Sequence, residues 1–377
     1  MEADTNSGNM AALLHRYTEF ARDIPEQGGF IYAAICARLA TDPDRAALAL
    51  RAAPAFQGPL ILLAAVHHLL LTGAVHGLGD YYPTVAGGAA RPIDADLYPA
   101  FAEFLDEHRD AVELLIATRT TQTNEARRTV VTLPALGLVA ERAGRPLALL
   151  EVGASAGLNL LLDRFGFRIG EVVCGDPASP LQLSCEIRGG LLPPVPAKPP
   201  DIGWRLGLDL NPLDVTDPAT RAWLRALVWP EHLDRMETLD AALALARRDP
   251  PLVVRGDLVT ELAAVAAGAP RDAALVVTST WVLAYVDPPL RDAFLDALAS
   301  LATKRGNATW LVAGEAQSVL ATLAPGAVEA PADGYGPSTV SLHRFDPDGG
   351  RSHTLLAECH AHGRWLRWLD PATAAPA

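Results

Sequence analysis

One segment, residues 147–160, constrains the fold of this chain more than any other. It reads LALLEVGASAGLNL: an apolar run typical of a buried strand, an acid where that strand ends, a turn of small residues and the first turns of a helix. Gly153 and Gly157 let the backbone turn sharply and approach a ligand, and the amides that begin the helix near Leu158 favour an oxygen-rich group. The pattern predicts an α/β fold with a ligand-binding turn, although such turns also occur in α/β proteins that bind nothing there.

The acid at the strand end narrows the choice of ligand. A dinucleotide-binding turn keeps negative charge away from the pyrophosphate and carries its acid about 20 residues later. In this chain Glu151 comes just before Gly153, and Ser155 replaces the middle glycine. The pattern acid-x-Gly-x-small-x-Gly resembles the first motif of class I S-adenosylmethionine (SAM)-dependent methyltransferases. That resemblance implies SAM as the cofactor, with contacts from Glu151, Gly153, Ala154, Ser155, Gly157 and Asn159.

The chain changes character at this segment. Before it the apolar spacing is helical, and the expected helices cover residues 30–40, 59–73, 98–115 and 124–143. After it strands and helices alternate, which is the pattern of a mostly parallel sheet. The expected strands are residues 147–152, 203–209, 252–256, 274–280, 309–314, 339–345 and 354–360, the last two forming a hairpin.

These elements predict an α/β, Rossmann-like protein with a seven-stranded methyltransferase-type sheet and an N-terminal helical lobe. We expect the helical lobe to span residues 1–120 and the Rossmann domain residues 121–370. Residues 168–201, rich in Pro and Gly, interrupt the alternation and predict an insertion with two short strands. The Ala- and Pro-rich residues 371–377 predict a loose tail.

Charge and composition exclude several classes of partner. The formal net charge of −13 and the sequence pI near 5.2 give no electrostatic footprint for a nucleic-acid backbone. The four cysteines are dispersed, and no ligand set has the spacing of a metal site. The most apolar run, residues 59–71, is too short to span a bilayer, and residues 1–10 lack the pattern of a signal peptide. We therefore expect a cytoplasmic protein with a small-molecule substrate and no metal, and a homodimer is the assembly we consider.

Acids at the ends of later strands extend the candidate site, because ligands of open α/β sheets bind outside the carboxyl ends of the strands. Asp209, followed by Leu210, ends one strand, and the methyltransferase resemblance implies that its carboxylate binds the ribose hydroxyls. Asp176 competes for that role by its distance from the glycine turn. Asp257, followed by Leu258, ends the next strand, and the same resemblance implies a contact with the adenine amino group. Each aspartate is equally typical of a turn or a helix cap.

Other polar and aromatic groups are candidates for contacts with the cofactor or the substrate. Residues 120–128 precede the glycine turn, and their side chains suit the amino and carboxylate groups of SAM, with Arg128 for the carboxylate; otherwise they cap a helix. Aromatic side chains are candidates to flank the sulfonium, or they belong to the core. A turn histidine is a candidate base. The polar cluster consists of Gln122, Asn124, Glu125 and Arg128. The aromatic candidates are Tyr81, Tyr82, Trp281 and Tyr285, with the polar candidate Ser279 near the last two, and the histidine is His362.

The turn also matches the Gly-x-Ser-x-Gly pattern of a serine hydrolase. In that interpretation Ser155 is the nucleophile, and Asp287 and His362 follow in the required order. Glu151, however, puts negative charge near the nucleophile, and no His-Gly-Gly loop precedes the turn to form an oxyanion hole. The hydrolase remains an alternative, as does a non-catalytic ligand-binding protein.

Several segments together resemble a bacterial family of unknown function, and the match covers nearly the whole chain. They are residues 122–125, 149–160, 209–212, 229–231 and 362–363. The resemblance implies a methyltransferase-like Rossmann domain with an N-terminal helical lobe, without a family-wide activity. The chain departs from the family at residues 278–280, where a histidine is more usual. We expect a SAM-dependent enzyme, with methyl transfer to a small molecule or other chemistry at the sulfonium, such as intramolecular cyclisation.

Overall fold

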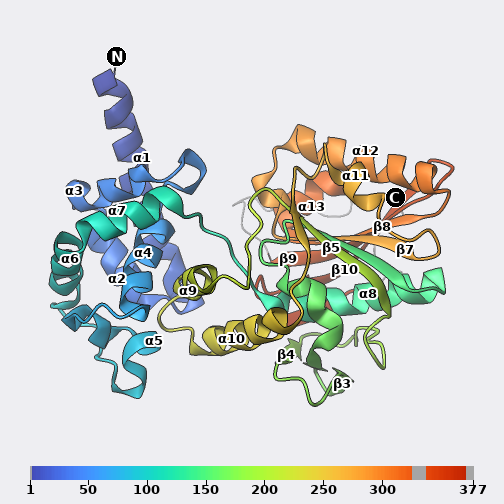
Figure 1. Cartoon of the computed structure of the whole chain (residues 1–377), viewed down its shortest axis with the longest axis horizontal. Helices are drawn as coiled ribbons and strands as arrows, with labels where there is room; N and C mark the ends of the chain where they lie inside the picture. Colours follow the sequence, from blue (N-terminus) through green and yellow to red (C-terminus); the bar gives the residue numbers. More distant parts are fainter. Residues whose placement is uncertain (1, 325–336, 371–377) are drawn as a thin grey trace. The chain divides into compact units, whose positions relative to one another are not determined.

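The computed structural model describes residues 2–324 and 337–370, which form two compact units (Figure 1). The first unit holds residues 1–123 and 216–240, and the second holds residues 124–215 and 241–377. The sequence placed the boundary near residue 120 and kept residues 216–240 with the sheet, whereas their contacts group them with the helical unit. The expected tail, residues 371–377, lies outside the described residues.

The first unit is helical. Its longer helices are α1 (Glu2–Asp23), α2 (Phe30–Leu39), α4 (Pro59–Leu71), α6 (Leu97–Glu107), α7 (Arg109–Thr118) and α9 (Pro218–Ala226), and α3 (Pro43–Ala46) and α5 (Pro83–Ala86) are single turns. α4 is apolar on nearly all sides and accordingly lies in the core of this unit. The expected helix 98–115 is two helices, because the backbone of His108 leaves the helical conformation between α6 and α7.

The second unit is an α/β structure built on a sheet of 11 strands in the described residues, where the sequence predicted seven. In chain order the strands are β1 (Leu147–Val152), β2 (Gly166–Ile169), β3 (Val172–Gly175), β4 (Gln182–Ile187), β5 (Ile202–Asp209), β6 (Val253–Arg255), β7 (Ala274–Thr280), β8 (Thr309–Ala316), β9 (Ser338–Phe345), β10 (Arg351–Cys359) and β11 (Trp365–Trp368). Across the sheet their order is β3-β2-β4-β11-β10-β9-β8-β7-β1-β5-β6. The seven expected strands all form, and β9 and β10 make the expected antiparallel hairpin.

Among the described residues the structure has four strands beyond the seven expected ones, namely β2, β3, β4 and β11. β2, β3 and β4 come from the Pro- and Gly-rich segment, where the sequence predicted only two short strands in an insertion. They extend the main sheet, since β4 pairs in parallel with β11, the last strand of the chain. β2, β3 and β11 have four residues each, which is too few for the alternation of side chains to distinguish a strand from a loop.

The strand order reverses its direction at β1. From β1 the chain continues to β5 and β6 on one side, and it returns to β7 and β8 on the other side, all in parallel. A ligand crevice in an open α/β sheet forms at the carboxyl ends of the strands at such a switch point. The register places Glu151 beside Thr278 of β7 and Gly207 of β5. The glycine turn therefore follows the strand at the switch point.

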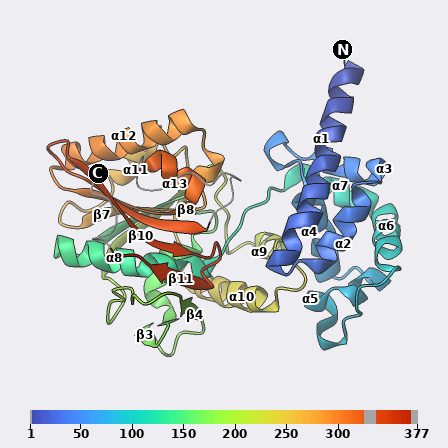
Figure 2. The same ribbon diagram turned by 180° about the vertical axis from the view of Figure 1, so that it is seen from behind.

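Helices cover both faces of this sheet (Figure 2). α8 (Thr129–Ala143) lies against one face, and α11 (Leu262–Ala266), α12 (Pro288–Arg305) and α13 (Gln317–Leu323) lie on the other. Leu150 and Val152 join the apolar core with α12 and α13, whereas Glu151 points to the face covered by α8. The remaining helix, α10 (Leu233–Arg248), contains the boundary between the units at residue 240. Within residues 2–324 and 337–370, no helix has the length and apolar character needed to cross a membrane.

Candidate functional site

The turn 153–157 has a backbone that few side chains tolerate. Gly153 and Gly157 lie in the left-handed region with φ of 67° and 69°, and Ser155 lies there as well, with φ of 52°. A Cβ atom on Gly153 would lie 2.2 Å from Cγ2 of Val282, which is far inside contact distance. Packing and backbone geometry together therefore require small residues in this turn.

Glu151, at the end of β1, is a buried carboxyl that is only 3% exposed. Its Oε1 accepts a hydrogen bond from Nδ2 of Asn159 at 2.9 Å, and its Oε2 has no hydrogen-bond partner. Burial raises the pKa of Glu151 to about 8; the charge of Asp209 adds to the rise, while the Asn159 donor and the charge of Arg128 oppose it. A cation placed beside this carboxyl would favour its charged form.

Glu151 lines a small cavity together with residues of α8, β7 and η7 (Leu158–Arg164), a 3-10 helix where the sequence predicted the first turns of a helix. The cavity holds about 10 Å³ of free volume, roughly the room for one water molecule. Oδ1 of Asn159 is buried without a partner, as is Oε2 of Glu151. The two residues that carry these unpartnered acceptors therefore line the same cavity. Its other walls are Arg128, Thr129, Thr132, Leu136, Leu149, Leu162, Thr278 and Thr280.

Arg128 is the cationic wall of this cavity and ends the 3-10 helix η6 (Ala126–Arg128). Its Nη1 donates to the carbonyl oxygen of Thr280 at 3.1 Å, and its Nε donates to the carbonyl oxygen of Ala361 at 3.2 Å. The central carbon of the guanidinium lies 5.9 Å from the ring centroid of Trp281. Arg128 therefore connects the end of β7 with the turn between β10 and β11. The predicted residue Trp281 lies beside the guanidinium of Arg128.

Asp209, at the end of β5, shapes the glycine turn. Its Oδ2 accepts from the amide of Ser155 at 2.8 Å, and its Oδ1 accepts from the amide of Asn211 at 2.7 Å. Asn124 holds the same turn: its Oδ1 accepts from the amide of Ala156, and its Nδ2 donates to Oγ of Ser155 at 2.9 Å. In the described part of the chain no histidine lies within hydrogen-bond distance of that Oγ. Asn124, Ser155 and Asp209, all predicted from the sequence, thus meet at one place.

Strand order separates the two aspartates that competed for the ribose. Asp209 follows β5, which is next to β1, whereas Asp176 follows β3 at the far edge of the sheet. Asp176 there accepts from the amide of Ala178 in a turn. Of the two, only Asp209 belongs to the switch point, and Leu210 beside it is 63% exposed.

Asp257 and Glu125 both hold local turns. Oδ1 of Asp257 accepts from the amides of Val259 and Thr260, and the amide of Asp257 donates to the carboxylate of Glu261. Leu258 packs partly buried against the sheet core. Glu125 is buried and accepts from the amide of Arg127 at 3.3 Å. The ligand contacts predicted for these residues stay predictions.

The remaining predicted residues lie in both units. In the second unit, Tyr285 is 88% exposed in the short η8 (Leu283–Tyr285) after β7, and His362 lies in the β10–β11 turn whose Ala361 carbonyl binds Arg128. In the first unit, the Tyr81 hydroxyl donates to Asp94 at 2.6 Å, and Tyr82 is fully buried. Gln122 also belongs to the first unit. Roles of these side chains at the ligand site stay predictions.

Glu315, near the end of β8, is a buried residue that the sequence analysis did not select. Its Oε1 accepts from Oγ of Ser279 at 2.6 Å and from the amides of Val282 and Leu283 at 3.1 and 3.2 Å. The sequence signal was present, because an acid directly follows the expected strand 309–314, and Glu151 likewise lies at the end of its expected strand 147–152. The predicted Ser279 is thus a partner of Glu315 inside the protein.

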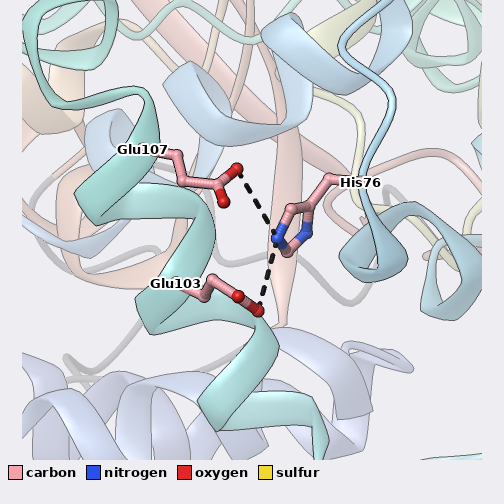
Figure 3. A group of neighbouring side chains, drawn as sticks. All are labelled: His76, Glu103 and Glu107. Carbon is pink, nitrogen blue, oxygen red and sulfur yellow. Dashed lines mark ion pairs between the residues drawn. The ribbon is translucent and has the colours of Figure 1, made fainter.

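One group of metal-ligating side chains comes together in the described residues, and it lies in the first unit (Figure 3). Nε2 of His76 is 3.6 Å from Glu103 and 4.0 Å from Glu107, which lie one turn apart on α6. Nδ1 of His76, however, accepts the amide of Leu78 at 3.0 Å. The proton of the neutral ring therefore sits on Nε2, the atom that a metal would need unprotonated. The arrangement is that of a histidine at ion-pair distance from two exposed carboxylates.

Comparisons with known proteins place the chain in a family. A search of curated proteins gives no match. Among solved structures, the sugar N-methyltransferase KedS8 from Streptoalloteichus sp ATCC 53650 is 14% identical, with 60% of this chain and 71% of that chain covered and a TM-score of 0.22, a likeness too weak to carry an argument about function. The family model "Uncharacterized protein conserved in bacteria (DUF2332)" matches residues 14–368. The chain therefore belongs to this family of bacterial proteins, DUF2332.

Proposed function

We propose that the second unit binds SAM and acts as a SAM-dependent enzyme on a small molecule. The observation that carries the proposal is the pair of unpartnered acceptors, Oε2 of Glu151 and Oδ1 of Asn159, on two residues that line one cavity beside Arg128. Buried polar atoms without partners are rare in proteins and call for an explanation, such as a bound water or a bound ligand. Here they lie at the switch point of a parallel sheet, where ligands of α/β proteins bind.

The acceptors of this cavity fit the ammonium group of SAM, the one part of its amino-acid end that a volume of about 10 Å³ admits. An ammonium group has three donors and no acceptor, so it suits the two oxygens of Glu151 and Asn159. A carboxylate suits a guanidinium, and Arg128 supplies one at the same cavity. An α-amino acid carries both groups on one carbon. The raised pKa of Glu151 supports this assignment, because an ammonium would provide the missing counter-charge.

The adenosyl end of the ligand would extend along the neighbouring strands. Asp209 uses both carboxylate oxygens to hold the glycine turn, but a carboxylate oxygen accepts more than one hydrogen bond. Its position beside β1 therefore supports a contact with the ribose as well. Asp257, at the end of the next strand, is the candidate for the adenine amino group. Leu210 follows Asp209 in the chain and Leu258 follows Asp257, and both are candidates for apolar contacts with the ligand.

In such a site the residues of the chain bind and orient rather than transfer protons. SAM, when bound, supplies an electrophilic sulfonium that reacts with a nucleophile held in line with it. Arg128 and Glu151 would hold the charged end, and the indole of Trp281, which lies beside Arg128, would bound the same region. Methyl transfer to a small molecule and intramolecular reaction of the sulfonium both fit this arrangement, and a product assay distinguishes them.

Calorimetry with SAM and S-adenosylhomocysteine tests the proposal. We expect binding with a dissociation constant below about 100 μM, or roughly −5.5 kcal/mol. Glu151→Gln should weaken binding at least tenfold, because it removes the counter-charge of the ammonium. Glu171→Gln, in the exposed turn between β2 and β3, is the matched control and should bind like the wild type. The absence of heat at millimolar ligand would refute the proposal.

Ser155→Ala separates the proposal from the serine hydrolase. The Oγ atom faces the amide of Asn124, so we expect the variant to keep its affinity for S-adenosylhomocysteine within about threefold. Labelling of the wild type by a fluorophosphonate, lost in Ser155→Ala, would instead establish a nucleophilic serine. Binding of SAM without a product, either from SAM alone or with any acceptor, would show a non-catalytic protein.

A further inference from the structure

The carboxyl of Glu315 holds the backbone that follows β7. The residue is 1% exposed, and its Oε1 accepts from Ser279 at the end of β7 and from two consecutive amides of the next turn, Val282 and Leu283. Three donors therefore converge on one oxygen of a residue in the neighbouring strand. Glu315 thus determines the course of the chain where β7 ends.

Trp281, inside this turn, has an unusual backbone conformation. Its φ of 59° lies in the left-handed region, and Ser155 is the other described residue besides glycine with positive φ. A bulky side chain is strained there, and such strain persists only where the surroundings over-determine the backbone. The constraints are on both sides: the Trp281 amide donates to the carbonyl of Gly314 at 2.9 Å, Arg128 binds the preceding carbonyl of Thr280, and Glu315 binds the following amides.

The strained turn faces the proposed ligand site. The indole of Trp281 lies 5.9 Å from the guanidinium carbon of Arg128, so a carboxylate held by that arginine would lie beside the ring. The next side chain, Val282, packs against Gly153 of the glycine turn, where a Cβ atom would be only 2.2 Å away. The turn that Glu315 holds therefore contacts both Arg128, through Trp281, and the glycine turn, through Val282.

We propose that Glu315 is a positioning residue, which fixes the indole of Trp281 as a wall of the ligand site next to the group that Arg128 binds. The inference rests on the proposed function, because it names the wall of that same site. A glycine would adopt this backbone without strain. The chain instead carries its largest side chain at a strained position and clamps it from three sides, which points to a use for the indole in this orientation.

Fluorine NMR of protein labelled with 5-fluorotryptophan tests this inference. The chain has seven tryptophans, and the resonance of Trp281 is assigned by its loss in Trp281→Phe. We expect Glu315→Ala to shift or broaden this resonance and to weaken binding of S-adenosylhomocysteine at least tenfold. Glu315→Gln keeps an acceptor oxygen for the three donors, and it should restore the wild-type resonance and bring the affinity to within about threefold of wild type.

Trp365 provides the matched control. It is also half-buried and stacked by an arginine, with the guanidinium carbon of Arg188 4.6 Å from its ring centroid, but it lies on β11. Its resonance should stay unchanged in Glu315→Ala, which also shows that the variant is folded. If Glu315→Ala does not fold, Ser279→Ala replaces it: loss of one of the three donors should move the Trp281 resonance in part.

The outcomes separate this inference from the proposed function. A Trp281 resonance that does not move in Glu315→Ala, or in Ser279→Ala where that variant is needed, overturns the positioning role. If Trp281→Ala binds S-adenosylhomocysteine as tightly as the wild type does, Trp281 is not a wall of the ligand site, and the proposed function is unaffected. Absence of ligand binding by the wild type refutes the proposed function and the wall together, while the NMR comparison still tests whether Glu315 positions the ring.

Discussion

The carboxyl ends of β1 and β8 each carry a fully buried glutamate, and the two are used differently. Glu315 on β8 receives three donors on one oxygen and holds the turn after β7. Glu151 on β1 receives one donor and lines a cavity that is also lined by Asn159, which carries an unpartnered oxygen. Burial raises the pKa of both carboxyls, so both are costly to keep charged. Their donors decide what each one does.

The carboxyl ends of the strands thus combine a rigid region around Glu315 with a receptive region around Glu151, in which a ligand could bind. At Glu315 the protein supplies three hydrogen bonds to Oε1, which fix the backbone after β7, while Oε2 has no partner. At Glu151 the protein supplies one hydrogen bond, and a cationic ligand would supply the others. Val282 joins the two regions, because its amide binds Glu315 and its side chain packs on Gly153.

Removing the charge at Glu151 should change how stability depends on pH. The pKa is about 8 in the folded protein and 4.5 ordinarily, so the folded state holds the proton more tightly than the unfolded state. Stability should therefore be highest below pH 4.5 and should fall as the pH rises to 8, by about 5 kcal/mol in all. Glu151→Gln should lack this fall. Urea unfolding at pH 5, 7 and 8.5 measures it, and equal pH profiles for the variant and the wild type would contradict the receptive role.

Adding a methyl group at Gly153 should break the contact between the two regions. Gly153→Ala combines a positive φ with an overlap against Val282, and we expect a loss of about 3 kcal/mol. Gly306→Ala is the control, because Gly306 has the same φ of 67° with open space around its Cβ position; it should lose about 1 kcal/mol. Val282→Ala should partly rescue Gly153→Ala in thermal unfolding. Equal losses at the two glycines would show that the contact with Val282 is unimportant.

Asparagine substitutions at Asp209 and Asp257 should separate an acid that needs both oxygens from one that needs a single oxygen. Asp209→Asn turns an NH₂ group toward one of the two amides that the carboxylate accepts and should cost about 2 kcal/mol. Asp257→Asn keeps the one oxygen that its turn uses and should stay within about 0.5 kcal/mol of the wild type. Chemical denaturation compares the two. If Asp257→Asn binds S-adenosylhomocysteine more weakly while its stability is unchanged, Asp257 is a ligand contact.

The predictable part of the fold lies where local patterns are strong. β1 and β7 have the predicted bounds, because both are apolar runs ended by polar or small residues. β2, β3 and β11 are only four residues long, so the alternation of their side chains is too short to distinguish them from loops. That residues 216–240 belong with the helical unit was not predictable for another reason: which elements an amphipathic helix packs against is not written in its own periodicity.

The sequence by itself determined the α/β architecture of the second unit, the helical character of the first and the strand–turn segment 147–160, because periodicity and the steric demands of glycine act over a few residues. Tertiary structure alone placed Asp209 at the switch point and Asp176 at the far edge of the sheet, since these positions depend on strand order. It alone brought Glu315 to the turn after β7 and left one oxygen of Glu151 without a partner. Hydrogen bonding and burial are relations between distant segments, and they give two similar glutamates different roles.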